Sequence, residues 1–129
     1  MPVNTVIDRE RNLIIHSITE TMSLSVIIET ISKTLNDPDY QAGMDAIWHF
    51  IDVSEVDLSS EDLMYAAEFS RKNIDKEGKA YKLALVAAED LPFGLTRAYE
   101  AWCNERPVSI NNFRVLDDAL KWINQEHVA

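Results

Sequence analysis

The strongest constraint on the fold is a nearly unbroken apolar run in the middle of the chain, Ala46–Val53 (AIWHFIDV). A strand with one face in water alternates apolar and polar residues, whereas a strand covered on both faces is apolar throughout. The run therefore predicts a central strand that is buried on both sides. Tyr81–Ala88 (YKLALVAA) is the next predicted strand, and Val108–Arg114 is a shorter one.

The N-terminal part of the chain predicts a β-hairpin followed by a helix. Val3–Ile7 and Leu13–Ile18 are rich in β-branched residues and are separated by a polar run. Apolar residues then recur at helical spacing from Leu24 to Leu35, and Ser23 is placed as the N-cap. The polar break Asn36–Asp39 ends this helix.

A second helix is predicted from Ser59 to about Asp75. Ser59 is a good N-cap, and Asp62 stands at the capping-box position. Leu58 and Leu63 flank the cap as a hydrophobic staple.

A third helix is predicted between the last two strands, with Asp90 as its N-cap and Pro92 in its first turn. Pro107 stops this helix. The residues assigned to its apolar face are Leu91, Leu95, Ala98 and Trp102. The residues that mark a final helix are Leu116, Leu120 and Ile123.

The predicted order is ββαβαβαβα, in one domain that spans residues 1–129. Strands that alternate with helices favour right-handed crossovers and a mostly parallel, mixed α/β sheet with an antiparallel N-terminal strand. If all the helices packed on one side, the other face of the sheet would stay partly open. Together with the apolar first strands, such a face predicts a homodimer.

The charge balance excludes two classes of partner. The chain carries 12 Lys and Arg against 22 Asp and Glu, a net charge of −10, which repels nucleic acid and anionic membrane surfaces. No apolar stretch approaches the ~20 residues of a membrane helix, and the N-terminus lacks the pattern of a signal peptide. Cys103 is the single cysteine. These features predict a protein of the cytoplasm that is not embedded in a membrane.

No cofactor motif is present. The glycines Gly43, Gly78 and Gly94 lie too far apart to form a phosphate-binding loop. No group of residues meets the requirements for a nucleophile, a base and a group that orients the base, so no catalytic residue is assigned. We therefore expect a protein that is not an enzyme and that needs no cofactor.

The histidines are weak evidence for a metal site in this sequence. His16 and His49 lie on strands that are predicted neighbours, so they could approach each other, but no third ligand is fixed beside them. We interpret both as strand side chains, one of them hydrogen-bonded, and expect no metal site. His127 belongs to the C-terminal tail.

The cysteine and the tryptophans have plain structural interpretations. Cys103 is interpreted as a partly buried thiol, because a reactive thiol needs a base and its acidic neighbours raise the pKa. Trp48, Trp102 and Trp122 stand at core-like positions. Packing is the preferred interpretation for them, and the wall of an apolar pocket is the alternative.

Candidate binding residues follow from the strand ends, because ligands of parallel sheets lie beyond the carboxyl ends of the strands. Asp52 is taken as the end of the central strand. The candidate residues near that end are Asp52, Ser54, Ser59 and Ser60. A second neighbourhood at the next strand end consists of Glu89, Asp90, Phe93 and Gly94. Gly94 there predicts either a close approach of the backbone or a ligand, or merely a tight turn.

The segment Phe50–Leu63 (FIDVSEVDLSSEDL) is similar to the strand–loop–helix pattern of STAS domains. In that pattern an apolar strand ends in Asp, and Asp-Ser-Ser-Gly-Leu opens the helix. The ββαβαβαβα order also resembles these domains, whose founding members are anti-sigma-factor antagonists of the SpoIIAA kind. The wider chain resembles the SpoIIAA-like, STAS/SEC14-type group of small bacterial proteins. The segments that carry this likeness are Asn36–Tyr40, Leu83–Ala87, Phe93–Arg97, Phe113–Arg114 and Ala119–Ile123.

The resemblance implies a function without catalysis. The first hypothesis is a regulatory module that binds a protein partner, and the alternative is a carrier or sensor of a small apolar molecule or lipid. In phosphorylation-switched STAS proteins the second serine of the motif is phosphorylated, and Ser60 matches that serine by position. The motif differs at two places, where Leu58 replaces the Asp and Glu61 replaces the Gly. Arg97 joins the candidate binding residues through its matching segment. Acidic neighbours oppose a phosphate on Ser60, so we expect Ser59 to cap the helix and Ser60 to fill its first turn.

Overall fold

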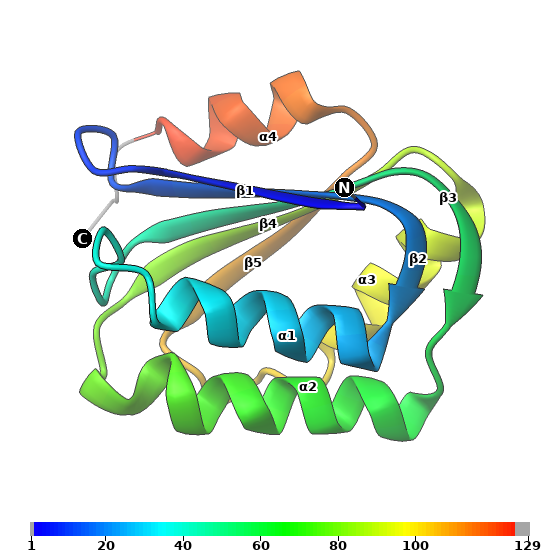
Figure 1. Cartoon of the computed structure of the whole chain (residues 1–129), viewed down its shortest axis with the longest axis horizontal. Helices are drawn as coiled ribbons and strands as arrows, with labels where there is room; N and C mark the ends of the chain where they lie inside the picture. The colour runs from blue at the N-terminus through cyan, green and yellow to red at the C-terminus, as the bar shows by residue number, and fades with distance from the viewer. Residues whose placement is uncertain (1, 126–129) are drawn as a thin grey trace.

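A computed structural model describes residues 2–125, so His127 lies outside the described residues. Five strands form one sheet in sequential order (Figure 1). They are β1 (Val3–Asp8), β2 (Leu13–Ser23), β3 (Asp45–Asp57), β4 (Tyr81–Ala87) and β5 (Val108–Phe113). β1 is antiparallel to β2, and the other neighbours are parallel. The predicted mixed sheet with an antiparallel first strand is confirmed.

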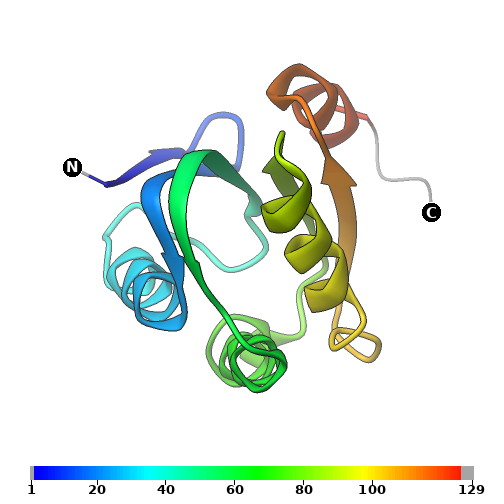
Figure 2. The same ribbon diagram turned by 90° about the vertical axis from the view of Figure 1, so that its right-hand side faces the viewer.

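The helices are α1 (Leu24–Leu35), α2 (Ser60–Asn73), α3 (Asp90–Glu100) and α4 (Leu116–Ile123), with a short 3-10 helix, η1 (Asp75–Glu77). Each parallel connection advances by one strand in the same direction. Right-handed crossovers of this kind place α1, α2 and α3 on one face of the sheet. α4 follows the last strand and packs on the opposite face (Figures 1 and 2).

The sheet therefore separates two hydrophobic cores. Under the three crossover helices, the core is built around Ile18, Trp48 and Leu83, whereas Ile47 and Val86 face α4 on the other side. All seven residues of β4 are buried, as expected for a strand that is covered on both faces. No helix within residues 2–125 has the length and apolar character needed to span a bilayer.

α4 leaves part of its face of the sheet uncovered. Val6 on β1 is 53% exposed. It is paired with Ile15 of β2, which packs against the edge of the α4 core. The expected open face is thus reduced to the part of the sheet near β1, because α4 packs on β3, β4 and β5.

β2 and β3 run further than the sequence predicted and bend together (Figure 1). Their pairing register shifts around Glu20, and the backbone is left-handed at Glu20 (φ 68°) and at Asp52 (φ 46°). The Ser54 hydroxyl donates a hydrogen bond to the Glu20 carbonyl across the bend. Bulges of this kind turn a strand without ending it. The prediction that Asp52 ends the central strand is therefore wrong.

The predicted start of α2 is confirmed. Ser59 is the N-cap, its hydroxyl accepts a hydrogen bond from the Asp62 amide, and the Asp62 carboxylate accepts one from the Ser59 amide. Ser60 is the first residue of the helix and is exposed.

This geometry predicts different costs for the two serines. Ser59→Ala removes the acceptor for a helix amide and should lower the free energy of unfolding by about 1 kcal/mol. Ser60→Ala should change it by much less, because its side chain caps nothing. Urea unfolding of the two variants and the parent protein measures the difference. Equal effects of the two substitutions would contradict the assignment.

The predicted orientation of α3 is wrong. Its N-cap is Glu89, with no side-chain capping bond, while the carboxylate of Asp90 pairs with Arg114 at 2.8 Å. Leu91 is 62% exposed, and Trp102 lies beyond the helix and is 48% exposed. The buried positions of this stretch are Pro92, Thr96 and Cys103, with Phe93, Leu95 and Tyr99 partly buried. Polar residues on that buried side interrupt the apolar periodicity, so the sequence did not indicate which side of the helix is buried.

Candidate functional site

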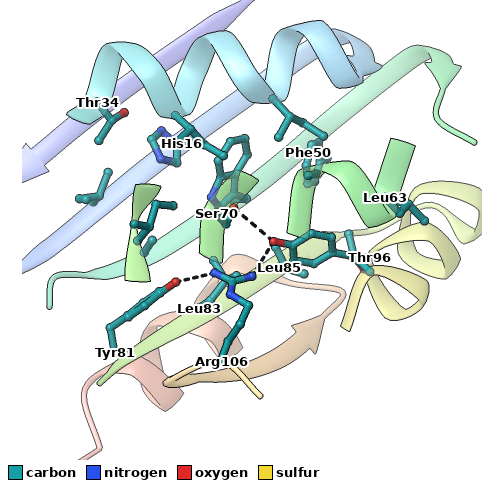
Figure 3. Close-up of a pocket in the computed structure, with 18 of the residues that line it drawn as sticks. His16, Thr34, Phe50, Leu63, Ser70, Tyr81, Leu83, Leu85, Thr96 and Arg106 are labelled. Atoms are coloured by element: carbon teal, nitrogen blue, oxygen red, sulfur yellow. Dashed lines mark hydrogen bonds between the residues drawn. The ribbon is translucent and has the colours of Figure 1, made fainter. Parts of the chain in front are cut away.

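A cavity lies between the sheet and the helices α1, α2 and α3 (Figure 3). Its walls are mainly apolar and come from every layer of that side of the protein. The apolar residues that line it include Ile31, Trp48, Phe50, Leu63, Leu83 and Leu85. A pocket wall was the alternative interpretation of the tryptophans, and Trp48 serves both as core and as wall.

The size of the cavity limits what it can hold. It leaves about 90 Å³ of space that water-sized spheres can fill. One water molecule needs about 10–15 Å³ on this scale. The space therefore accommodates several waters or one small molecule of the size of a single ring. Typical ligand pockets measure ~300–1,000 Å³, so a lipid chain would require the helices to move apart.

One end of the cavity adjoins the surface. Leu35, Tyr40 and Ile74 line the cavity and also line a shallow polar depression between the C-terminal ends of α1 and α2. Each of these three side chains is partly exposed. At this end the cavity and the surface depression are separated only by these side chains.

His16 lies in the cavity wall and is only 3% exposed. Its Nδ1 is 2.8 Å from the hydroxyl of Thr5, and its ring lies 4.4 Å from the ring of Trp48. Burial lowers the pKa of His16 to about 4, so the imidazole is neutral near pH 7. The predicted hydrogen-bonded strand histidine is confirmed.

His49 faces the other side of the sheet. His16 is in register with Trp48, and Ser17 is in register with His49. Because successive strand residues point to opposite faces, the two histidines cannot share a ligand, and the approach considered from the sequence does not occur. Within residues 2–125 there is no cluster of three or more potential metal-ligating His, Cys, Asp or Glu side chains.

A buried polar network centred on Arg106 also borders the cavity (Figure 3). Its guanidinium pairs with Asp75, with Nε 2.6 Å from Oδ2, and both side chains are 3% exposed. Arg106 also donates to the Tyr99 hydroxyl at 2.8 Å and to the Tyr81 hydroxyl at 2.7 Å. The Tyr81 hydroxyl in turn donates to Asp75.

This network uses the whole hydrogen-bonding capacity of Arg106. Nε and Nη2 donate to Asp75, Nη1 donates to Tyr99 and to the Cys103 sulfur, and Nη2 also donates to Tyr81. A guanidinium has five N–H donors, and all five are engaged. Burial disfavours its charge, but Asp75 and the two tyrosines outweigh burial and raise the pKa of Arg106. Arg106 is therefore a structural cation without a donor left for a ligand.

Cys103 belongs to the same network and is buried. Burial raises the pKa of its thiol, and the nearby Arg106 only partly opposes this. The interpretation as a plain buried thiol is confirmed, although the main cause of the raised pKa is burial rather than the acidic neighbours.

None of the candidate binding residues assigned from the sequence lines the cavity. Those residues are Asp52, Ser54, Ser59, Ser60, Phe93, Gly94 and Arg97. The first four are exposed and follow one another along β3 and the start of α2. Phe93 lies under the guanidinium of Arg114 at 3.9 Å, and Arg97 is exposed. A binding role for these residues stays a prediction.

Gly94 sits within α3, and a Cβ built on it meets no atom within 4 Å. The predicted close approach at this glycine is therefore wrong.

Gly94→Ala should raise the free energy of unfolding by up to about 1 kcal/mol. Alanine has a higher helix propensity than glycine, and this exposed position in α3 has an ordinary helical backbone that alanine can adopt. Thermal unfolding measures this, and a destabilised variant would contradict the open surroundings of Gly94.

The sequence did not predict His16 as a cavity residue, and it gave no indication of the Arg106 network as a whole. The partners of Arg106 come from η1, β4, α3 and the turn after α3. These partners are not related by any regular spacing along the sequence. The one local signal was Tyr81 at the start of a strand that is buried throughout, because a buried tyrosine hydroxyl needs a hydrogen-bond partner.

Comparison with known proteins identifies the fold. No family model matches the sequence, and no curated protein matches it. Among solved structures, the chain is similar to an uncharacterized protein of the DUF3478 family from Shewanella loihica, described as having a SpoIIAA-like fold. The TM-score is 0.55 at 16% identity, over 94% of this chain and 93% of that one. The chain has a SpoIIAA-like fold.

The SpoIIAA-like fold agrees with the resemblance drawn from the sequence. At 16% identity the likeness concerns the fold alone. Function therefore has to be argued from the residues of this chain, because one fold serves many functions.

Proposed function

We propose that the protein is a non-catalytic binding module that holds a small, mainly apolar ligand in the cavity beneath α1, α2 and α3. The observation that carries the proposal is the cavity itself, which lies within the hydrophobic core on this side of the sheet. Protein interiors are close-packed, and an empty space of this size costs stability. A ligand that fills the space recovers the lost contacts, as small apolar molecules do in apolar cavities.

The chemistry of the cavity wall favours binding over catalysis. The nearest approach to a catalytic pair is the hydrogen bond between Thr5 and His16. A general base works best with a pKa near the working pH, and a base with a pKa near 4 accepts protons weakly at neutral pH. Among the described residues, no carboxylate hydrogen-bonds to this imidazole to orient it. The wall is thus suited to enclosing a molecule rather than transforming it.

Filling the cavity from the protein side tests this function. Ala66 on α2 is 1% exposed and lines the cavity, so Ala66→Leu places three additional carbon atoms there. Benzene titrated into the parent protein should produce saturable NMR shifts of the methyl groups of Ile31 and Leu83. Ala66→Leu should abolish these shifts. The matched control is Ala98→Leu, the same substitution at an exposed position of α3, which should leave binding unchanged.

Either of two results would contradict the proposal. If benzene produces no saturable shifts in the parent protein, or if Ala66→Leu binds it as well as the parent does, the cavity is not a ligand site. Folding of both variants is checked by their amide spectra, so a loss of binding is not confused with unfolding.

A second function, a regulatory module that binds a protein partner, is favoured by the uncovered region of the sheet near β1. Val6 is exposed there beside the apolar side chain of Ile15. The partner that we expect on this surface is a second copy of the chain.

The homodimer is a separate prediction. Light scattering at ~100 μM should give the mass of a dimer, because an interface of standard size holds well below that concentration. Val6→Lys should shift the mass to that of a monomer, since it places a charge in the contact. A parent protein that is monomeric at this concentration would contradict the prediction.

A further inference from the structure

The cavity contains one buried polar group that the protein leaves partly unpaired, the imidazole of His16. Its Nδ1 is engaged by Thr5, but among residues 2–125 no hydrogen bond reaches its other ring nitrogen, Nε2. The side chain is 3% exposed and lines the cavity, as Figure 3 shows. Nε2 is not fully enclosed by protein atoms, since Asn112 Oδ1 and not Nε2 is the unsatisfied buried side-chain atom of residues 2–125. A molecule in the cavity can therefore supply the hydrogen bond that the protein does not.

The neutral imidazole limits the chemistry of that partner. One of its ring nitrogens carries a proton and the other accepts one, and the Thr5 hydroxyl can fill either role opposite Nδ1. Nε2 therefore accepts a hydrogen bond from a hydroxyl or donates one to a carbonyl.

The charges around the cavity exclude an ionised ligand. The one buried cation of the wall, Arg106, has all five N–H donors engaged and its charge balanced by Asp75. An anion or cation that entered the cavity would lose its water without gaining a counter-charge, which is strongly unfavourable.

The rings beside His16 favour an aromatic ligand. His16 and Trp48 lie 4.4 Å apart between ring centroids, and Trp48 and Phe50 lie 6.3 Å apart in a stacked arrangement. All three side chains line the cavity, and aromatic rings pack well against such a surface. The size of the space restricts the ligand to about one ring.

We infer that the ligand is a neutral single-ring molecule with one hydroxyl or carbonyl group, and that this group pairs with Nε2 of His16. The inference rests on the proposed function, since it names the class of ligand for the same cavity. The polar group fixes the orientation of the molecule, while Trp48 and the apolar wall enclose its ring.

Three single-ring probes test the inference: benzene, phenol, which adds a hydroxyl group, and benzoate, which adds a charged carboxylate. In the parent protein phenol should bind about 2- to 12-fold more tightly than benzene, which is the gain expected from one buried hydrogen bond. Benzoate should show no saturable binding. His16→Phe should reverse the order of phenol and benzene, because the hydroxyl then has no partner. His49→Phe, the same substitution on the other face of the sheet, should leave the order unchanged.

A measurement without any substitution complements the variants. The ¹⁵N shift of Nε2 in His16 should move on addition of phenol and stay in place on addition of benzene. If phenol and benzene bind equally and Nε2 does not respond, His16 is not the anchor, although the cavity still binds ligands. If benzene itself fails to bind, the proposed function is wrong as well. Saturable binding of benzoate would overturn the restriction to neutral ligands.

Discussion

Arg106→Met should lower the free energy of unfolding by about 3–5 kcal/mol, the largest loss that we expect from any single polar side chain in this protein. The substitution removes the guanidinium and leaves the buried carboxylate of Asp75 without its cation. The hydroxyls of Tyr81 and Tyr99 lose a donor at the same time. Chemical denaturation of the two proteins at pH 7 measures the difference.

Arg114→Met is the matched control for this prediction. Arg114 pairs with Asp90 at a similar distance, but the Asp90 side chain is almost fully exposed. Exposed ion pairs contribute ~0–1 kcal/mol, so this variant should lose little. Replacing Arg106 and Asp75 together by methionine and leucine should recover part of the loss, because no unpaired charge remains. Equal losses for Arg106→Met and Arg114→Met would contradict the buried network.

The stability of the protein should decrease by about 3 kcal/mol between pH 6.5 and pH 4 through His16 alone. Burial lowers the pKa of this histidine from its ordinary value of 6.5 to about 4 in the folded state. In the unfolded chain it takes up a proton as the pH falls through 6.5, whereas the folded protein resists protonation until about pH 4. Acid therefore favours the unfolded state throughout this window, and above pH 6.5 the effect vanishes.

The measurement compares urea unfolding of the parent protein and of His16→Phe at pH 7 and at pH 4.5. Carboxylates titrate in both proteins, so the contribution of His16 is the difference between the two pH dependences. His49→Phe is the control, because His49 is only partly buried and its pKa is lowered less strongly by desolvation. If the parent and His16→Phe lose the same stability on acidification, His16 is not buried as described.

The sequence was most informative where burial is continuous. Ala46–Val53 and Tyr81–Ala88 predicted the central strands because a strand covered on both faces leaves an unbroken apolar run. Ser59 and Asp62 predicted the start of α2 because a capping box is a local arrangement of neighbouring residues. Local physics of this kind can be read from one sequence.

The errors arose where tertiary structure overrides the local pattern. At Asp52 a polar residue in a left-handed conformation looked like the end of a strand, but bulges shared with β2 carry β3 onward. In α3 the spacing of Leu91 and Trp102 predicted a buried apolar face, but both side chains are exposed. Thr96 and Cys103 occupy the buried side instead. In both places the neighbouring elements, which the sequence does not display, decide the outcome.

The candidate site illustrates the same limit. Strand ends were searched for ligand residues, as is usual for parallel sheets. The cavity lies instead between the sheet and its crossover helices, and its polar groups, His16 and Arg106, come from β2 and from the turn before β5. A buried histidine and a saturated arginine are defined by what surrounds them, so their roles became visible only in three dimensions.

The central claim is that the cavity under α1, α2 and α3 takes a small aromatic ligand, and a crystal structure with bromobenzene tests it most directly. We expect an anomalous peak from bromine inside the cavity, in contact with Trp48, Ile31 or Leu83, and no such peak in crystals of Ala66→Leu. A structure in which the cavity holds only ordered water, with bromine absent or bound solely at the surface, would contradict it.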